Sequence, residues 1–93
     1  MGNTSTRAKW MLKWEATNPL RVWRTTYSIS REHVATTVGV SYMSVRSWEL
    51  GFVVPDLDRM DALADLMGEK SKQLQLDWAQ WRNTREAFMQ RHR

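Results

Sequence analysis

The apolar positions between residues 29 and 38 recur at helical spacing and predict a short amphipathic helix. Val34, Ala35 and Val38 fall on one side of a helix that we expect over about residues 31–37. Ser30 directly precedes this stretch, and a serine at that place accepts a hydrogen bond from an unpaired backbone N–H group of the first helical turn. The polar positions between the apolar ones are left for solvent.

A second helical pattern follows a break at Gly39, which can adopt the positive φ found just past helix ends. Ser41 is a candidate N-cap for a helix over about residues 42–50. Val45 and Trp48 face inward in this helix, and its early side chains face outward. The pattern therefore predicts two short helices joined by a tight turn.

Further helices are expected on both sides of this pair. Asn18 followed by Pro19 predicts a helix to about residue 26, and Asp56 is the N-cap of another. A last, long amphipathic helix is expected over about residues 72–90. The apolar stripe of the helix after Asp56 consists of Leu57, Met60, Leu63, Ala64 and Met67.

No alternating apolar pattern indicates a sheet, so the expected fold class is all-α, a compact arrangement of five helices with an N-terminal extension. We divide the chain into three parts. Residues 1–17 form a basic N-terminal arm or an extra helix, and residues 18–70 form a central domain that contains the helix pair. Residues 71–93 form a C-terminal helix for packing or dimerisation.

The length of 93 residues suffices for one small domain, and the composition limits its class. The absence of cysteine excludes disulfides and thiolate metal sites. No apolar run has the length of a membrane span or the form of a signal peptide. We therefore expect a soluble cytoplasmic protein that makes no contact with a membrane.

The net charge of +4 is unevenly distributed along the chain. Residues 1–33 carry six basic and two acidic side chains, whereas residues 51–70 carry two basic and five acidic ones. A basic segment beside an outward-facing helix is the electrostatic footprint expected for contact with nucleic-acid phosphates. An ordinary solvated surface is the alternative interpretation.

A spaced set of nine residues lies within and around the helix pair. It consists of Ser30, Glu32, Ala35, Gly39, Val40, Ser41, Glu49, Gly51 and Pro55. This set resembles, position by position, the lambda-repressor-like family, which comprises Cro/repressor and Xre-type helix-turn-helix proteins. The resemblance implies that the pair is helices 2 and 3 of a helix-turn-helix DNA-binding domain, with its second helix in the major groove of double-stranded DNA.

The same resemblance implies that the outward residues of the second helix contact bases. Tyr42, Met43 and Ser47 occupy the positions that most often face bases, and Ser44 and Arg46 lie at the groove edge. Arginine makes bidentate bonds to guanine, whereas methionine and tyrosine offer apolar contact to a thymine methyl group. Alternatively, Tyr42 and Met43 pack against the preceding helix.

Arg31, Ser41 and Arg21 are the expected phosphate contacts. Arg31 stands where the family commonly has a phosphate-bonding glutamine, at the N-terminal end of the first helix of the pair. The alternative for Arg31 is a side chain exposed to solvent. Arg24 and Glu49 match a partly buried ion pair that, in several relatives, joins helix 1 to the recognition helix, and we interpret this pair as structural.

The match breaks after the second helix, where relatives carry polar residues that help to hold phosphate. This chain has Leu50 and then an apolar loop with Phe52 and Val54, which marks a dimer or partner contact or folds back on the C-terminal helix. Trp78 and Trp81 are further candidates for a dimer or partner contact. Alternatively, they lock the two ends of the chain together.

The sequence has no feature typical of an enzyme. It lacks a cysteine–histidine pair, a glycine-rich phosphate loop and a spaced histidine cluster, so we expect no catalysis, no cofactor and no metal. The expected function is that of a sequence-specific double-stranded DNA-binding transcriptional regulator, a homodimeric repressor of phage, plasmid or antitoxin type associated with the nucleoid. The alternative is a helix-turn-helix fold used as a protein-interaction module, in toxin neutralisation or docking on host transcription machinery.

Overall fold

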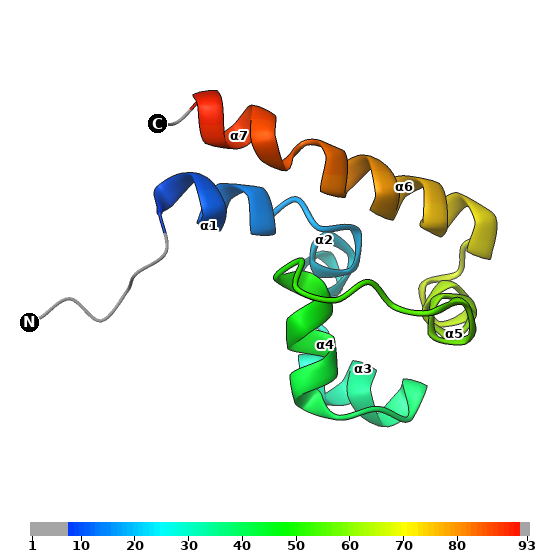
Figure 1. The fold of residues 1–93 in the computed structure, drawn as a ribbon. Coiled ribbons are helices and arrows are strands. Elements are labelled where there is room, and N and C mark those ends of the chain that lie inside the picture. Colours follow the sequence, from blue (N-terminus) through cyan, green and yellow to red (C-terminus); the bar gives the residue numbers. More distant parts are fainter. Residues whose placement is uncertain (1–7, 92–93) are drawn as a thin grey trace, which may run out of the picture.

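The structure is a computed structural model that describes residues 8–91, and this part of the chain is all-helical, without strands. The expected all-α fold class is therefore confirmed. Figure 1 shows α1 and α7 side by side at one end of the molecule and the turn between α3 and α4 at the opposite end. The helices are α1 (Lys9–Glu15), α2 (Pro19–Thr26), α3 (Arg31–Val38), α4 (Tyr42–Glu49), α5 (Leu57–Met67), α6 (Ser71–Asn83) and α7 (Arg85–Arg91).

Four of these helices begin at a side-chain N-cap that the sequence predicts. The side-chain oxygens of Asn18, Ser30, Ser41 and Asp56 each accept a hydrogen bond from the backbone N–H three residues later, at 2.9–3.1 Å. Each cap satisfies a donor that has no partner inside its helix and contributes about 1 kcal/mol. The caps therefore fix where α2, α3, α4 and α5 start.

The turn between α3 and α4 depends on the left-handed conformation of Gly39, whose φ is 82°. The backbone N–H groups of Gly39 and Val40 both donate to the carbonyl of Ala35, at 2.8 and 3.0 Å, and so close the end of α3. Val40 packs against the core, and Ser41 then caps α4. Three residues thus set the angle at which α4 leaves α3.

The core lies where α2, α3, α4, α5 and α6 meet. Each of these helices contributes a side chain with no exposed surface: Leu20, Val34, Val45, Leu63 and Leu74. The stripe predicted on α5 is buried at its centre, where Met60, Leu63 and Ala64 lie. The prediction is wrong for Leu57, which is 61% exposed because α5 begins at the surface, directly after an exposed loop.

The five-helix count is wrong, since the described residues form seven helices. One additional helix is α1, which lies in the segment predicted to be a basic arm or an extra helix. Residues 1–7 of that segment, Arg7 included, lie outside the described residues. The other is produced by a break at Thr84, where the predicted last helix divides into α6 and α7.

The break at Thr84 has a local cause in the carbonyl oxygen of Trp81. This oxygen accepts hydrogen bonds from the Thr84 hydroxyl at 2.6 Å, the Thr84 backbone N–H at 3.1 Å and the Trp14 indole N–H at 2.9 Å. These donors occupy an acceptor that a continuous helix uses for its own ladder. The sequence pattern shows no sign of a donor from Trp14, which is 67 positions away.

Trp14 and Trp81 lock the two ends of the chain together. Their rings stack with centroids 4.1 Å apart and planes 3° from parallel, and the Trp81 indole N–H donates to the Trp14 carbonyl at 3.0 Å. The guanidinium group of Arg85 lies over the rings of Trp10 and Trp14, 5.0 and 5.7 Å from their centroids. We call Trp14 and Trp81 the tryptophan clamp.

The burial of Trp78 and Trp81 contradicts the prediction that these two residues contact a dimer or protein partner. Trp78 is 1% and Trp81 is 4% exposed. The edge of one ring meets the face of the other, with planes 83° apart, and both residues belong to the core cluster. Their surface is covered by the protomer itself, so the alternative interpretation of the terminal tryptophans, locking of the two ends, describes them.

Candidate nucleic-acid interface

The helix α4 presents its first turn to solvent and its opposite side to the core. Val45 and Trp48 are 0% and 5% exposed and fix the helix in the domain. Tyr42 and Met43 are 39% and 58% exposed at the N-terminal end. Met43 therefore does not pack into the core, and the one-sided burial leaves the first turn of α4 free to contact another molecule.

Serine hydroxyls surround this exposed turn. The Ser41 hydroxyl accepts from the backbone N–H of Ser44 at 3.1 Å and shares a second hydrogen bond of 3.1 Å with the Ser44 hydroxyl. Ser44, Arg46 and Ser47 are half-buried, so these predicted base contacts lie on the flanks of the more exposed Tyr42 and Met43. A hollow of about 190 Å³ on this face is lined by Ser41, Met43, Ser44, Ser47, Trp48 and Val53.

The carboxylate of Glu49, at the other end of α4, is fully buried and is held by two arginines. Arg24 makes the paired contact expected from the sequence, with its Nε 2.7 Å from Oε2 and its Nη2 2.8 Å from Oε1. The Nη1 of Arg24 also donates to the carbonyl of Ile29 at 3.1 Å. Arg24 thereby ties α2 both to α4 and to the residue before the cap of α3.

Arg31 is the second arginine on Glu49, a contact that the sequence analysis missed. Its Nε donates to Oε1 of Glu49 at 3.0 Å, and its Nη1 donates to the Tyr42 hydroxyl at 3.4 Å. Partial burial lowers the pKa of Arg31, but the hydrogen bonds to Tyr42 and Glu49 outweigh it, so the pKa lies above its ordinary value. A single carboxylate can accept hydrogen bonds from two arginines, so the sequence allowed Arg31 to bind Glu49 together with Arg24.

The other two predicted phosphate contacts differ in their surroundings. The side chain of Arg21 is half-buried on α2, and it makes no hydrogen bond or ion pair with the residues that the structure describes. Ser41 is exposed, but its hydroxyl is already engaged as the cap of α4. Arg21, Arg31 and Ser41 thus belong to three different elements: α2, α3 and the turn before α4.

The segment Phe52, Val53 and Val54, which we call the apolar loop, follows α4 directly. Its side chains are 67%, 52% and 45% exposed, and Val54 lines a pocket together with Trp78 and Ala79 of α6. The backbone N–H groups of Phe52 and Val53 donate to the carbonyl of Ser47 at 3.0 and 3.4 Å. These bonds hold the apolar loop against the end of α4 while its side chains stay in solvent.

Residues 8–91 contain neither a cluster of potential metal ligands nor a helix suited to span a membrane. These residues contain no group of three or more histidine, cysteine, aspartate or glutamate side chains placed to hold a metal ion. None of the described helices has both the length and the apolar character needed to cross a bilayer.

Comparison with known proteins gives no match. No family model matches the chain, and no curated protein or solved structure is significantly similar to it. The function is therefore inferred from the residues and geometry of α3, α4 and their surroundings.

Proposed function

We propose that the protein is a sequence-specific double-stranded DNA-binding regulator in which α3 and α4 form a helix-turn-helix. The observation that carries this proposal is the one-sided burial of α4. Val45 anchors the helix, while Tyr42 and Met43 are exposed at its N-terminal end, the end from which a recognition helix contacts base edges. The resemblance of residues 29–55 to the lambda-repressor-like family supports the same assignment.

The charges around Glu49 support contact with phosphate. Arg24 and Arg31 together carry two positive charges against one carboxylate, which leaves one positive charge beside α4. Arg31 is also the first residue of α3, where the helix dipole adds to the attraction for an anion. In the proposed complex Arg31 bonds a phosphate while Glu49 holds the guanidinium group in place, with Arg21 and Ser41 as neighbouring contacts.

Base readout is assigned to α4. Tyr42 and Met43 contact apolar base edges such as thymine methyl groups, and Ser44, Arg46 and Ser47 bond to the edges beside them. Since one helix reads only a few base pairs, the proposed active form is a homodimer on two half-sites about one helical turn apart. The biological role is that of a phage, plasmid or antitoxin-type repressor acting on DNA in the cytoplasm.

A salt titration tests the proposal. Fluorescence anisotropy should show tight binding to a duplex selected from a random pool and weaker binding to a scrambled duplex, with both affinities falling steeply as salt rises. Equal, weak affinity for all duplexes contradicts sequence-specific binding.

Three variants locate the interface. Arg31→Ala should weaken binding to every duplex alike, whereas Arg46→Ala and Ser47→Ala should change the preferred sequence. Lys72→Ala is the matched charge control, because Lys72 is exposed on α6, away from the turn between α3 and α4 (Figure 1). If Lys72→Ala weakens binding as much as Arg31→Ala does, α4 is not the contact surface.

The exposed apolar loop supports a second candidate function, that of a protein-interaction module such as one for toxin neutralisation or docking on host transcription machinery. Contiguous apolar side chains on a small protein often mark a protein contact. Phe52→Ser separates the two functions, since it should leave the affinity of one protomer for a half-site duplex unchanged. Loss of binding to a protein partner by Phe52→Ser, without change in DNA binding, favours the interaction module.

A further inference from the structure

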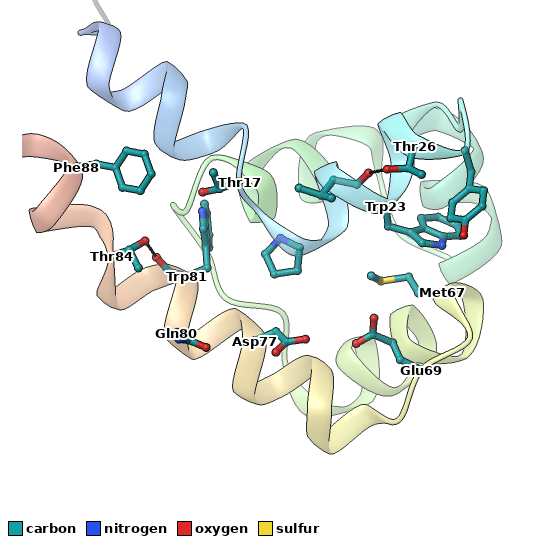
Figure 2. A pocket seen from close by; sticks show the side chains of 13 residues that line it. Thr17, Trp23, Thr26, Met67, Glu69, Asp77, Gln80, Trp81, Thr84 and Phe88 are labelled. Atoms are coloured by element: carbon teal, nitrogen blue, oxygen red, sulfur yellow. Dashed lines mark hydrogen bonds between the residues drawn. The ribbon is translucent and has the colours of Figure 1, made fainter. Parts of the chain in front are cut away.

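A groove of about 620 Å³ runs between α2 and α6 and is bounded by the end of α5 and by α7. Figure 2 shows Trp23 at one end of this groove, Trp81 and Phe88 at the other, and Glu69 and Asp77 along one side. The volume falls within the range of pockets that hold drug-sized ligands, roughly 300–1,000 Å³. It exceeds what a single amino-acid side chain fills.

The groove is negatively charged although the chain as a whole carries +4. Glu69 and Asp77 both line it, and no lysine, arginine or histidine does. Glu69 forms no ion pair with the described residues, and Asp77 accepts a hydrogen bond only from the uncharged amide of Gln73, at 2.9 Å. Partial burial and then the charge of Asp77 raise the pKa of Glu69, so the two carboxylates repel each other.

The rest of the lining is mostly apolar or aromatic. The rings of Trp23 and Tyr27 lie 5.8 Å apart with planes 51° from parallel, and Tyr27 is 64% exposed. Val22, on the same helix, is 47% exposed. Aromatic faces attract cations, and apolar walls accommodate the aliphatic stem of a long basic side chain. The chemistry of the groove thus complements a cation carried on an apolar segment.

We propose that this groove docks a protein partner that inserts a lysine or arginine side chain flanked by apolar residues. The cation lies between Glu69 and Asp77, and the flanking residues contact Val22, Trp23 and Tyr27. The residues that line the groove belong to α2, α5, α6, α7 and the segments beside them, and none belongs to α3 or α4. The proposal therefore does not rest on the proposed function.

The test is a titration of the full chain, labelled with ¹⁵N, with a short blocked peptide that has one arginine between two leucines. Amide shifts should concentrate on α2, on the second half of α6 around Asp77 and at Glu69. A peptide with the uncharged isostere citrulline in place of arginine should bind more weakly. Equal binding of the two peptides, shifts confined to other helices, or no shifts at millimolar peptide overturns the proposal. Spermidine bound as tightly as the peptide also overturns it, because the groove is then a site for small cations.

Two surface variants complete the test. The double variant Glu69→Gln, Asp77→Asn should lower the affinity for the arginine peptide by about fivefold, as expected for solvent-accessible ion pairs. Asp65→Asn is the matched control, since Asp65 is an exposed acid on α5 that does not line the groove. An unchanged affinity in the double variant, or an equal loss in the control, contradicts the assigned site.

Discussion

Trp14 and Trp81 make reciprocal contacts with each other. Each indole N–H donates to the backbone carbonyl of the other residue, and each of these carbonyls also accepts the hydroxyl of the threonine three positions later, at 2.6 Å. The threonines are Thr17 and Thr84. The two halves of the tryptophan clamp are thus local copies of one arrangement, joined by two reciprocal hydrogen bonds and one stacking contact.

The reciprocal contacts predict strong energetic coupling within the clamp. Trp14→Phe and Trp81→Phe each remove one N–H donor and part of the stacked area, and each should lower the free energy of unfolding by about 2 kcal/mol. The double variant should lose less than the two single losses together, by about 1 kcal/mol, in a cycle measured by urea unfolding. Additive losses would show that the residues stabilise the fold independently.

Trp10 supplies a control for the clamp. It is half-buried beside Arg85 but takes no part in the exchange of hydrogen bonds between α1 and α6. Trp10→Phe should therefore cost less than either clamp variant and should show no coupling to Trp81→Phe. A cost equal to that of Trp14→Phe would mean that bulk aromatic packing, not the reciprocal bonding, holds the ends.

Gly51 and Gly39 allow the effect of backbone strain to be separated from that of crowding. Their φ values are 80° and 82°, but a Cβ on Gly51 would lie 2.5 Å from Cη2 of Trp14, whereas one on Gly39 meets nothing within 4 Å. Gly39→Ala should cost about 1 kcal/mol for the left-handed backbone alone. Gly51→Ala should cost about 3 kcal/mol because crowding against the ring adds to the strain.

The stabilities are compared through the urea concentration at which each glycine variant is half unfolded, provided that the free energy of unfolding falls with urea at the same slope in each variant. The double variant Gly51→Ala, Trp14→Phe should lose less stability than the sum of the two single losses, because the smaller ring makes room for the new methyl group. Equal losses in the two glycine variants would show that crowding against Trp14 contributes nothing to the cost.

Removal of the buried carboxylate of Glu49 should destabilise the protein strongly. Glu49→Ala leaves Arg24 and Arg31 close together without their shared counter-charge, and the expected loss of unfolding free energy is about 3 kcal/mol. Asp65→Ala, an exposed acid on α5, should change it by less than about 0.5 kcal/mol. Thermal unfolding at neutral pH distinguishes the two, and a small effect of Glu49→Ala would show that the ion pairs are not needed to hold α4.

The raised pKa of Glu69 predicts a stabilising substitution. Since the folded-state pKa lies above the unfolded-state value, the charged carboxylate destabilises the fold at neutral pH, and this effect disappears once the pH falls below the unfolded-state pKa. Glu69→Gln should therefore raise the melting temperature at pH 7 and leave it unchanged near pH 3. Screening by solvent keeps the gain in unfolding free energy to about 0.3 kcal/mol.

The pKa of Glu69 depends partly on the charge of Asp77, and this dependence provides a check on the prediction. In an Asp77→Asn background one of the two causes of the raised pKa is absent, so Glu69→Gln should give a smaller gain at pH 7. A melting temperature that falls in Glu69→Gln at pH 7 would contradict the sign of the shift.

The boundaries of the central helices could be predicted because their signals are local. Ser30, Ser41 and Asp56 bond to backbone groups only three residues away, and Gly39 closes its helix on Ala35. Such contacts depend on neighbouring residues and are present in the sequence as written. They were sufficient to locate the start of α4, and the spacing of Val45 and Trp48 was sufficient to identify its inward face.

The remaining features depend on contacts between distant positions. The break at Thr84 involves a donor on Trp14 besides the two donors of Thr84 itself, and the orientation of Arg31 follows from Glu49, which is also bound by Arg24. Neither contact has a periodic signature. The repeated spacing of tryptophan and threonine, Trp14 with Thr17 and Trp81 with Thr84, was visible in the sequence, but it gains its meaning only when α1 and the end of α6 are brought together.

The tryptophan clamp also joins distant parts of the chain. It joins positions 67 residues apart, so its formation closes most of the described chain into a single loop, at an entropic cost that grows only slowly with loop length. Because α1 and α7 lie side by side (Figure 1), a chain opened at the apolar loop and linked from α7 to α1 would retain every helix and the clamp itself. The path of the described helices thus returns close to where it starts, with α7 packed against α1.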